Sequence, residues 1–159
     1  MFKNILILCT GNICRSPMAE VLLRERLYRR RDTTIGSAGT SALIGYPADP
    51  LAVEVAGAYG FDLSRHLARQ ATSPLLLAAD LILVMSRAHA GWIADRVPQL
   101  RGRVHLLGRW RDFEIPDPYQ QPRDAFQQSF EQIDDCIGDW IPRLAGPDPE
   151  PSDPGGTAL

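Results

Sequence analysis

A cysteine and an arginine stand six positions apart near the start of the chain, in the run Cys9-Thr-Gly-Asn-Ile-Cys-Arg-Ser16. A cysteine thiolate is a strong nucleophile, and a planar guanidinium can hold two phosphoryl oxygens at once. A loop that curls around a phosphoryl group would bring Arg15 back over the ligand beside Cys9. This spacing predicts a phosphate-binding loop in which the Cys9 thiolate attacks phosphorus.

The residues between Cys9 and Arg15 suit a loop that surrounds an anion. Gly11 permits close approach of the backbone, and Asn12 tolerates a left-handed conformation. The N–H groups of such a loop, together with the dipole of a following helix, favour both a phosphate dianion and a thiolate. The Ser16 hydroxyl is placed to hydrogen-bond that thiolate. The residues expected to bind phosphate are Thr10, Gly11, Asn12, Ile13, Cys14, Arg15 and Ser16.

The cysteines allow more than one interpretation. A buried cysteine at the end of a strand is the simple alternative for Cys9, but it leaves the Gly-Asn turn and Arg15 unexplained. Cys14 either fills space under the loop or traps an oxidised Cys9 as a reversible disulfide, and the sequence leaves both open. With Cys136 there are three cysteines, which fit a reducing compartment better than a disulfide framework. No zinc-ligand spacing of Cys or His is present, so no metal is expected.

The elements that must position this loop follow from hydrophobic patterns. The short apolar run from Asn4 to Cys9 predicts a buried strand, and Ser16-Pro17 predicts a helix start with Ser16 as N-cap. A stripe of Phe126, Phe130 and three isoleucines indicates that the last helix packs on the core. Strands are predicted at 4–9, 33–38, 81–85 and 103–107, and helices at 17–30, 51–59, 75–79, 88–97 and 122–144.

Alternating strands and helices predict an α/β fold: a four-stranded parallel sheet with helices on both faces. The phosphate-binding loop then lies between the first strand and the first helix, at the edge where such sheets bind ligands. Residues 1–145 are expected to form one domain, and the Pro/Gly/Asp-rich stretch 146–159 a disordered tail.

The formal net charge of −2 gives no reason to expect nucleic acid as a partner. The longest early apolar run, Ile5 to Leu8, is too short for membrane insertion or a signal peptide, so a cytoplasmic location is expected.

Several motifs together resemble one known family, the low-molecular-weight protein tyrosine phosphatases of the bacterial type. The likeness covers about residues 3–144. It is carried by the run from Cys9 to Glu20 and by Ser37-Ala-Gly-Thr-Ser41, Asp62-Leu-Ser-Arg-His-Leu-Ala-Arg-Gln70 and Asp117-Pro-Tyr119. The resemblance implies a protein-tyrosine-phosphatase that hydrolyses phosphotyrosine through a cysteinyl-phosphate and releases inorganic phosphate. No cofactor is implied.

The resemblance also assigns roles to individual residues. It makes Cys9 the nucleophile, Arg15 the phosphate clamp and Asp117 the general acid, although Asp117 taken alone reads as an ordinary Asp-Pro turn. It makes Ser37 and His66 the residues that brace the Asn12 side chain.

The chain departs from the family pattern at the walls of the substrate cleft. The resemblance places Leu43 and Tyr119 there. This chain departs from some members in having Leu43 and Gln120 where those members carry aromatic residues, and Tyr46 is expected to compensate in part.

The implied partner is a phosphotyrosine-containing protein. Bacterial members suggest a tyrosine autokinase linked to exopolysaccharide or capsule production.

Two alternative functions belong to classes other than phosphatase. An arsenate reductase would use a similar loop but needs further cysteines to relay a disulfide, and only Cys14 and Cys136 are available. A non-catalytic phosphotyrosine-binding module would leave Cys9, Arg15 and Asp117 without a joint purpose.

Overall fold

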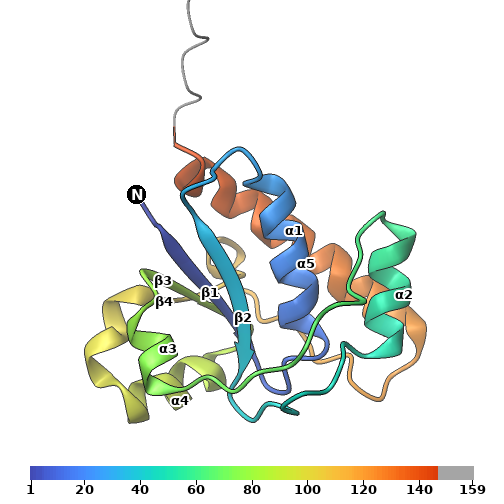
Figure 1. The fold of residues 1–159 in the computed structure, drawn as a ribbon, viewed down its shortest axis with the longest axis horizontal. Coiled ribbons are helices and arrows are strands. Elements are labelled where there is room, and N and C mark those ends of the chain that lie inside the picture. Colours follow the sequence, from blue (N-terminus) through green and yellow to red (C-terminus); the bar gives the residue numbers. More distant parts are fainter. Residues whose placement is uncertain (147–159) are drawn as a thin grey trace, which may run out of the picture.

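The computed structural model describes residues 1–146 and has a four-stranded parallel sheet at its centre (Figure 1). The strands are β1 (Asn4–Cys9), β2 (Thr34–Gly39), β3 (Leu81–Val84) and β4 (Val104–Leu106), in the spatial order β2-β1-β3-β4. Each neighbouring pair is parallel. The predicted fold class is confirmed, and the central strand β1 ends where the predicted phosphate-binding loop begins.

Helices cover both faces of this sheet, as predicted. They are α1 (Arg15–Arg26), α2 (Pro50–Ala58), α3 (Ser73–Leu77), α4 (Arg87–Arg96) and α5 (Arg123–Leu144), with 3₁₀ turns at Pro98–Arg103 and Arg109–Arg111. In Figure 1, α1 and α5 lie on one side of the sheet and α3 and α4 on the other. Since strand side chains alternate between faces, Ile5 and Ile7 enter one hydrophobic cluster and Leu6 and Leu8 the other.

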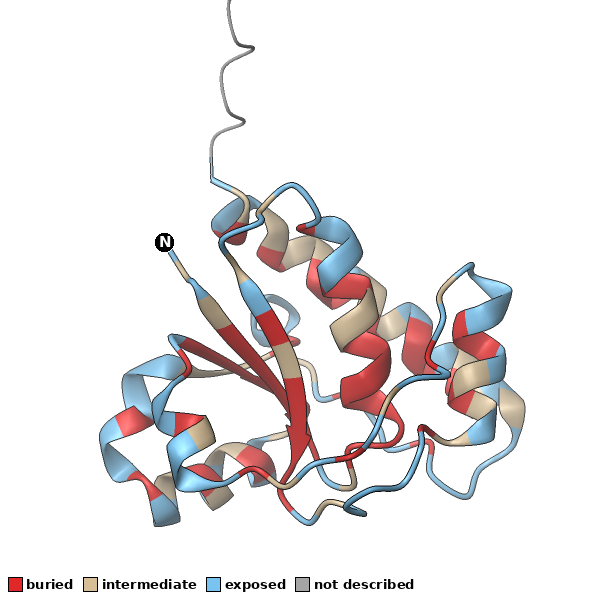
Figure 2. Ribbon diagram, in the orientation of Figure 1, coloured by how far each residue is buried: buried red, intermediate tan, exposed pale blue. Residues whose placement is uncertain are grey.

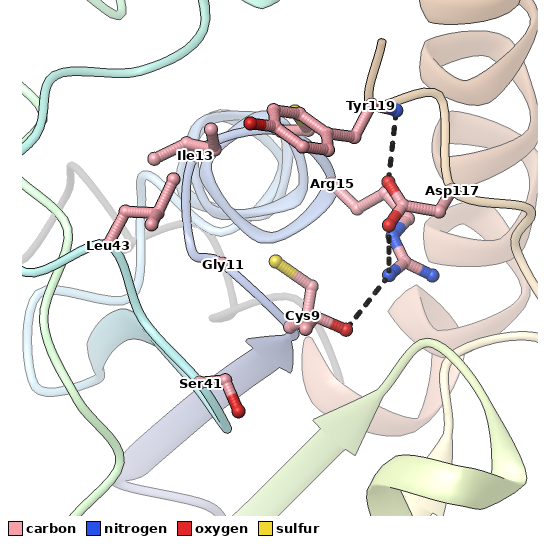
Figure 3. Close-up of a pocket in the computed structure, with 10 residues that line it drawn as sticks. Cys9, Gly11, Ile13, Arg15, Ser41, Leu43, Asp117 and Tyr119 are labelled. Atoms are coloured by element: carbon pink, nitrogen blue, oxygen red, sulfur yellow. Dashed lines mark hydrogen bonds and ion pairs between the residues drawn. The ribbon is translucent and has the colours of Figure 1, made fainter. Parts of the chain in front are cut away.

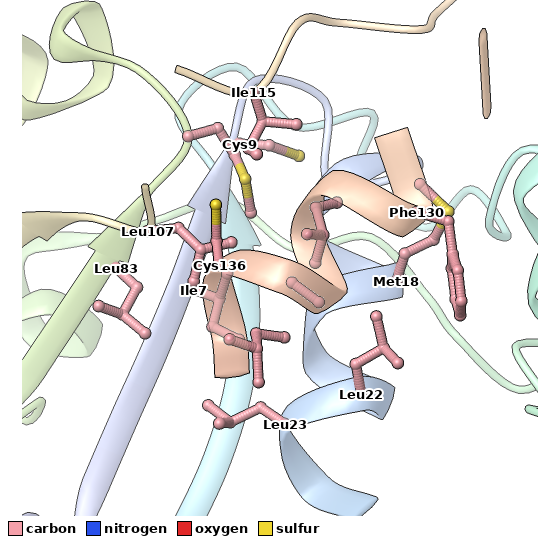
Figure 4. Close-up of a cluster of buried hydrophobic side chains, with 14 of the residues drawn as sticks. Ile7, Cys9, Met18, Leu22, Leu23, Leu83, Leu107, Ile115, Phe130 and Cys136 are labelled. Carbon is pink, nitrogen blue, oxygen red and sulfur yellow. The ribbon is translucent and has the colours of Figure 1, made fainter. Parts of the chain in front are cut away.

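The larger cluster joins β1 to α1 and α5, whose buried residues are red in Figure 2. Phe126, Phe130, Ile133 and Ile137 of the predicted α5 stripe are buried, and Ile141 packs against them while partly exposed. Figure 4 shows this cluster reaching Cys9 at the end of β1, so the nucleophile candidate is anchored in the core. Burial on this scale fixes the strand ends rigidly.

The first helix differs from its prediction at both ends. It begins at Arg15 with Cys14 as N-cap, so the prediction of Ser16 as N-cap is wrong. The Ser16 hydroxyl hydrogen-bonds inward, to the Cys9 sulfur and the Asn12 amide, and so does not cap the helix. The helix ends at Arg26, four residues before the predicted Arg30, where the chain turns towards β2.

Strand β2 forms one edge of the sheet, and arginine side chains donate hydrogen bonds to the carbonyl groups that point away from β1. Arg24 donates to the Ile35 oxygen from Nε at 3.2 Å and from Nη2 at 2.6 Å. Arg69 donates from Nε to the Ser37 oxygen at 2.8 Å. These contacts satisfy carbonyls that an edge strand otherwise leaves unpaired.

Within residues 1–146, no helix combines the length and apolar character needed to cross a membrane. The predicted tail, 146–159, lies outside the described residues except for Gly146.

Candidate active site

The loop from Cys9 to Arg15 joins the carboxyl end of β1 directly to the amino end of α1. Cys9 is the last residue of the strand and Arg15 the first of the helix. Asn12, in the middle, has φ of 58°, a left-handed conformation that asparagine tolerates. Five residues therefore make a tight turn beneath the positive end of a helix dipole, where an anion is favoured.

Four groups from outside the turn hold Asn12 in this conformation. Its side-chain nitrogen donates to Ser16 Oγ at 2.8 Å and to Ser37 Oγ at 2.9 Å. Its side-chain oxygen accepts from the Arg69 N–H at 2.9 Å. His66 Nε2 lies 2.6 Å from the main-chain oxygen of Asn12. His66 thus contacts the backbone and not the side chain, which corrects that detail of the expectation.

The Cys9 sulfur lies at the bottom of the loop, 2.9 Å from Ser16 Oγ. A hydroxyl can donate to a thiolate at this distance, and the amino end of α1 adds partial positive charge. Ser16 is itself buried and held by the Asn12 amide. The arrangement presents one sulfur, with a fixed donor beside it, to the space enclosed by the loop.

The Arg15 guanidinium is buried above that space, with its nitrogens in different environments. Nη1 donates to the Ile115 carbonyl at 2.9 Å. Nη2 lies 3.5 Å from Asp117 Oδ2 and 3.5 Å from Thr10 Oγ1. Nε is buried without a hydrogen-bond partner among residues 1–146. Because an unpaired buried donor is costly, Nε and Nη2 together form a ready site for two oxygens of an anion.

Asp117 approaches from the segment that leads into α5. Its Oδ1 accepts from the Tyr119 N–H at 3.1 Å, and its side chain is 47% exposed. Its carboxylate therefore faces both the Arg15 guanidinium and solvent. This position allows a proton to be exchanged with water and with a bound molecule.

Cys9, Arg15 and Asp117 line one cavity, which has a volume of about 180 Å³ (Figure 3). Ile13, Leu43 and Tyr119 form apolar walls, and Ser41, which the sequence analysis did not single out, also lines it. Tyr46, expected in the cleft, is not among the lining residues, and 61% of it is exposed. Its residue type alone suggested that place, and type says nothing of where the side chain lies.

Sequence reasoning missed His89, which contacts the phosphate-binding loop from α4. Its Nε2 lies 2.9 Å from Thr10 Oγ1 and its Nδ1 lies 3.1 Å from Ser86 Oγ. Burial, and then the Arg15 charge, lower the pKa of His89 to about 4. The available signal was its place three residues after Ser86, at the start of the helix that follows β3 and therefore at the same sheet edge.

The other cysteines are buried thiols. Cys14 and Cys136 are both free, and burial raises the pKa of Cys14 well above its ordinary value and that of Cys136 to about 11. Thiol–disulfide exchange requires a thiolate. Burial therefore makes both thiols less reactive than an exposed cysteine.

Comparison with known proteins agrees with this geometry. The family model described as "Low molecular weight phosphotyrosine protein phosphatase" matches residues 4–147. A probable low molecular weight protein-tyrosine-phosphatase EpsP of Ralstonia nicotianae is 47% identical over 91% of this chain and 97% of its own.

Solved structures give the same result. The tyrosine phosphatase Wzb from Escherichia coli K30, in complex with sulphate, superposes with a TM-score of 0.86 at 41% identity, over 91% of this chain and 99% of its own. Vibrio vulnificus Wzb in complex with benzylphosphonate gives 0.85 at 40% identity, over 91% and 100%. A family match across nearly the whole chain, with relatives above 40% identity, leaves one conclusion. The chain belongs to the low molecular weight phosphotyrosine protein phosphatase family.

Proposed function

We propose that this protein hydrolyses phosphotyrosine in proteins through a cysteinyl-phosphate intermediate. The observation that carries the proposal is the single cavity onto which the Cys9 thiol, the Arg15 guanidinium and the Asp117 carboxyl group all open. These are the three groups that the reaction requires: a nucleophile, a clamp for the phosphoryl oxygens and a proton donor.

In the first step the Cys9 thiolate attacks phosphorus in line with the tyrosyl oxygen. The loop N–H groups, Arg15 Nε and Arg15 Nη2 hold the equatorial oxygens, while the Ser16 hydroxyl steadies the sulfur before attack. Asp117 donates its proton to the departing oxygen, so that tyrosine leaves as a neutral phenol. The sulfur–phosphorus bond forms as the oxygen–phosphorus bond breaks.

In the second step water attacks the cysteinyl-phosphate. Asp117, ionised by the first step, accepts a proton from that water, and the thiolate leaves with inorganic phosphate as the product. The exposed side of the Asp117 carboxylate supports this role, because water can reach it.

The preference for tyrosine is supported by the walls of the cavity. Ile13, Leu43 and the Tyr119 ring offer apolar surface to an aryl group, and serine or threonine phosphate has no ring to fill it. The related Vibrio vulnificus Wzb has been solved in complex with benzylphosphonate. Like phosphotyrosine, that compound carries an aromatic ring and a tetrahedral phosphorus group.

The test is a panel of peptides that differ only in carrying phosphotyrosine, phosphoserine or phosphothreonine. Wild-type protein should release phosphate from the first alone. Cys9→Ser should abolish turnover while keeping the fold, as checked by thermal unfolding. Equal hydrolysis of all three peptides would overturn the tyrosine assignment, and full activity of Cys9→Ser would overturn the mechanism. Reductant-dependent loss of arsenate without aryl phosphatase activity would favour the arsenate reductase alternative.

The proposed physiological partner is a bacterial tyrosine autokinase linked to exopolysaccharide or capsule production, acting in the cytoplasm. The three free, buried cysteines suit a reducing compartment. Purified phosphorylated autokinase should lose its phosphotyrosine on incubation with wild-type protein and keep it with Cys9→Ser, as measured by anti-phosphotyrosine blotting. Unchanged phosphotyrosine with active wild-type protein would exclude that kinase as a substrate.

A further inference from the structure

His89 connects the phosphate-binding loop to the start of α4. It is 6% exposed, and both of its ring nitrogens have hydroxyl partners: Thr10 Oγ1 at 2.9 Å from Nε2 and Ser86 Oγ at 3.1 Å from Nδ1. Thr10 is the residue directly after Cys9, and Ser86 is the N-cap of α4. The ring therefore joins two elements that meet at the carboxyl edge of the sheet.

One arrangement of protons gives every hydrogen bond around His89 a donor and an acceptor. His89 is neutral near pH 7, because burial and the Arg15 charge disfavour its second proton, so only one ring nitrogen donates. Arg15 Nη2, 3.5 Å from Thr10 Oγ1, can only donate. If the Thr10 oxygen accepts from Arg15, its own proton is free to point to His89 Nε2. Nδ1–H of His89 then donates to Ser86, and each group in the chain is satisfied.

We propose that His89 is a positioning residue, which orients the Thr10 hydroxyl so that this hydroxyl holds Arg15 Nη2 partly away from Asp117. This inference rests on the proposed function, because it concerns how that reaction's clamp is set. Nη2 lies at the same 3.5 Å from the Thr10 hydroxyl and from the Asp117 carboxylate, so it is shared between them.

Of the two groups that lie near Arg15 Nη2, only the Asp117 carboxylate would remain if the Thr10 hydroxyl were lost. The guanidinium would then close on the carboxylate, since an ion pair with good geometry is stronger than a shared contact. One donor would turn away from the phosphoryl oxygens, and the ionised form of Asp117 would be stabilised when its protonated form is needed. Both effects lower phosphate affinity and the rate of the first step.

Two pairs of variants separate positioning from simple packing. His89→Gln places an amide near the Nε2 position and can still accept from Thr10, whereas His89→Asn reaches only the Nδ1 position, beside Ser86. Thr10→Ser keeps the hydroxyl, and Thr10→Val removes it with little change of volume. His105→Asn is the control, because His105 of β4 contacts Arg109 of the 3₁₀ turn and Trp140 of α5, and neither of these residues belongs to the phosphate-binding loop.

The first measurement is the affinity for inorganic phosphate by isothermal titration calorimetry, and the second is kcat/KM on a phosphotyrosine peptide. His89→Asn and Thr10→Val should each lose roughly threefold to tenfold in both quantities, the size of one hydrogen bond. His89→Gln and Thr10→Ser should lose less than their partners. The double variant His89→Asn/Thr10→Val should be no worse than either single change, because both break the same chain.

Equal losses for the Gln and Asn variants, in proportion to a fall in Tm, would overturn the proposal, and so would wild-type phosphate affinity in Thr10→Val. The Thr10 pair decides the matter if the His89 variants fail to fold. Phosphate binding needs no turnover, so this result stands apart from the proposed function. Absence of phosphotyrosine hydrolysis in wild-type protein would instead reject the function.

Discussion

At the scale of single residues, Arg15 divides its nitrogens between the protein and the site. Nη1 is fixed by the Ile115 carbonyl, whereas Nε has no hydrogen-bond partner among residues 1–146 and Nη2 lies between Asp117 and Thr10 at the cavity. A lysine has a single side-chain nitrogen, which could not both donate to the Ile115 carbonyl and hold two phosphoryl oxygens in a planar fork. Asp117 is positioned as closely, because the Tyr119 N–H fixes one of its oxygens and leaves the other towards Arg15.

Asp117→Asn should lower kcat on a phosphotyrosine peptide by about 10²- to 10⁴-fold, because the amide keeps the hydrogen bond to Tyr119 N–H but has no proton to give. Steady-state kinetics on that peptide measure the loss. Asp124→Asn, on the exposed first turn of α5, is the matched control and should leave kcat unchanged. A wild-type rate in Asp117→Asn would mean that another group donates the proton.

Residue types and spacing were enough to predict that Cys9 and Arg15 share a site, because a thiolate and a guanidinium suit one reaction on phosphorus, whereas Asp117 was added only by the resemblance to the phosphatase family. Residue types and spacing did not show that Tyr46 lies outside the cavity or that His89 contacts the phosphate-binding loop. Whether a side chain faces a cavity depends on the path of the loop that carries it, and the contact between Thr10 and His89 spans 79 positions. Chemistry can be recognised locally, whereas such a contact exists only in the folded chain.

At the scale of elements, the end of β2 supports the phosphate-binding loop from the side. A Cβ on Gly39 would lie 2.4 Å from the Thr10 carbonyl oxygen and 3.1 Å from Ala42. That oxygen also accepts from the Ser41 N–H at 3.0 Å. Only glycine allows the strand and the loop to approach this closely.

Gly39→Ala should therefore push the loop out of place, lowering the free energy of unfolding by about 1–3 kcal/mol and weakening phosphate binding. Urea denaturation and calorimetry with inorganic phosphate measure the two effects. Gly57→Ala in α2 is the matched control: nothing lies within 4 Å of its added Cβ, and it should be stabilised by up to about 1 kcal/mol. Unchanged phosphate affinity in Gly39→Ala would show that the loop does not depend on β2.

The elements themselves were predictable from hydrophobic runs, and their ends were less so. The helix after the loop starts at Arg15 and not Pro17, because the Ser16 side chain is needed by Cys9 and Asn12. Strand β4 is confined to Val104–Leu106, shorter than predicted, because the 3₁₀ turn before it continues to Arg103. Local propensity sets the type of an element, but competing tertiary contacts set its limits.

At the scale of the whole molecule, His89 links stability to pH. Its pKa is near 4 when folded and near 6.5 when unfolded, so between these values the unfolded chain binds the extra proton. Stability from this group is complete above pH 6.5 and is lost as the pH falls. The expected loss between pH 7.5 and 5 is about 2 kcal/mol. Urea denaturation of wild type and His89→Gln should show a smaller pH-dependent loss in the variant, and equal losses would refute the link.

The proposed domain, residues 1–145, should be sufficient for folding and catalysis. The stretch beyond it is rich in Pro, Gly and Asp and offers little apolar surface to bury. A chain ended after Gly146 should keep the Tm and the kcat/KM of the full chain, measured by calorimetry and by phosphate release from a phosphotyrosine peptide. A fall in either quantity would assign the tail a part in the fold or the site.

The arginine contacts along β2 have a consequence for how copies of this protein behave together. A bare edge strand is a template on which another molecule's strand can add, and repeated addition builds aggregates. Here the Ile35 and Ser37 oxygens already receive hydrogen bonds from Arg24 and Arg69. A second chain would have to displace two guanidinium groups and bring its backbone close to their positive charges. Arg24 and Arg69 thus complete the hydrogen bonding of β2 within one molecule, and they also hinder aggregation of concentrated protein through this edge.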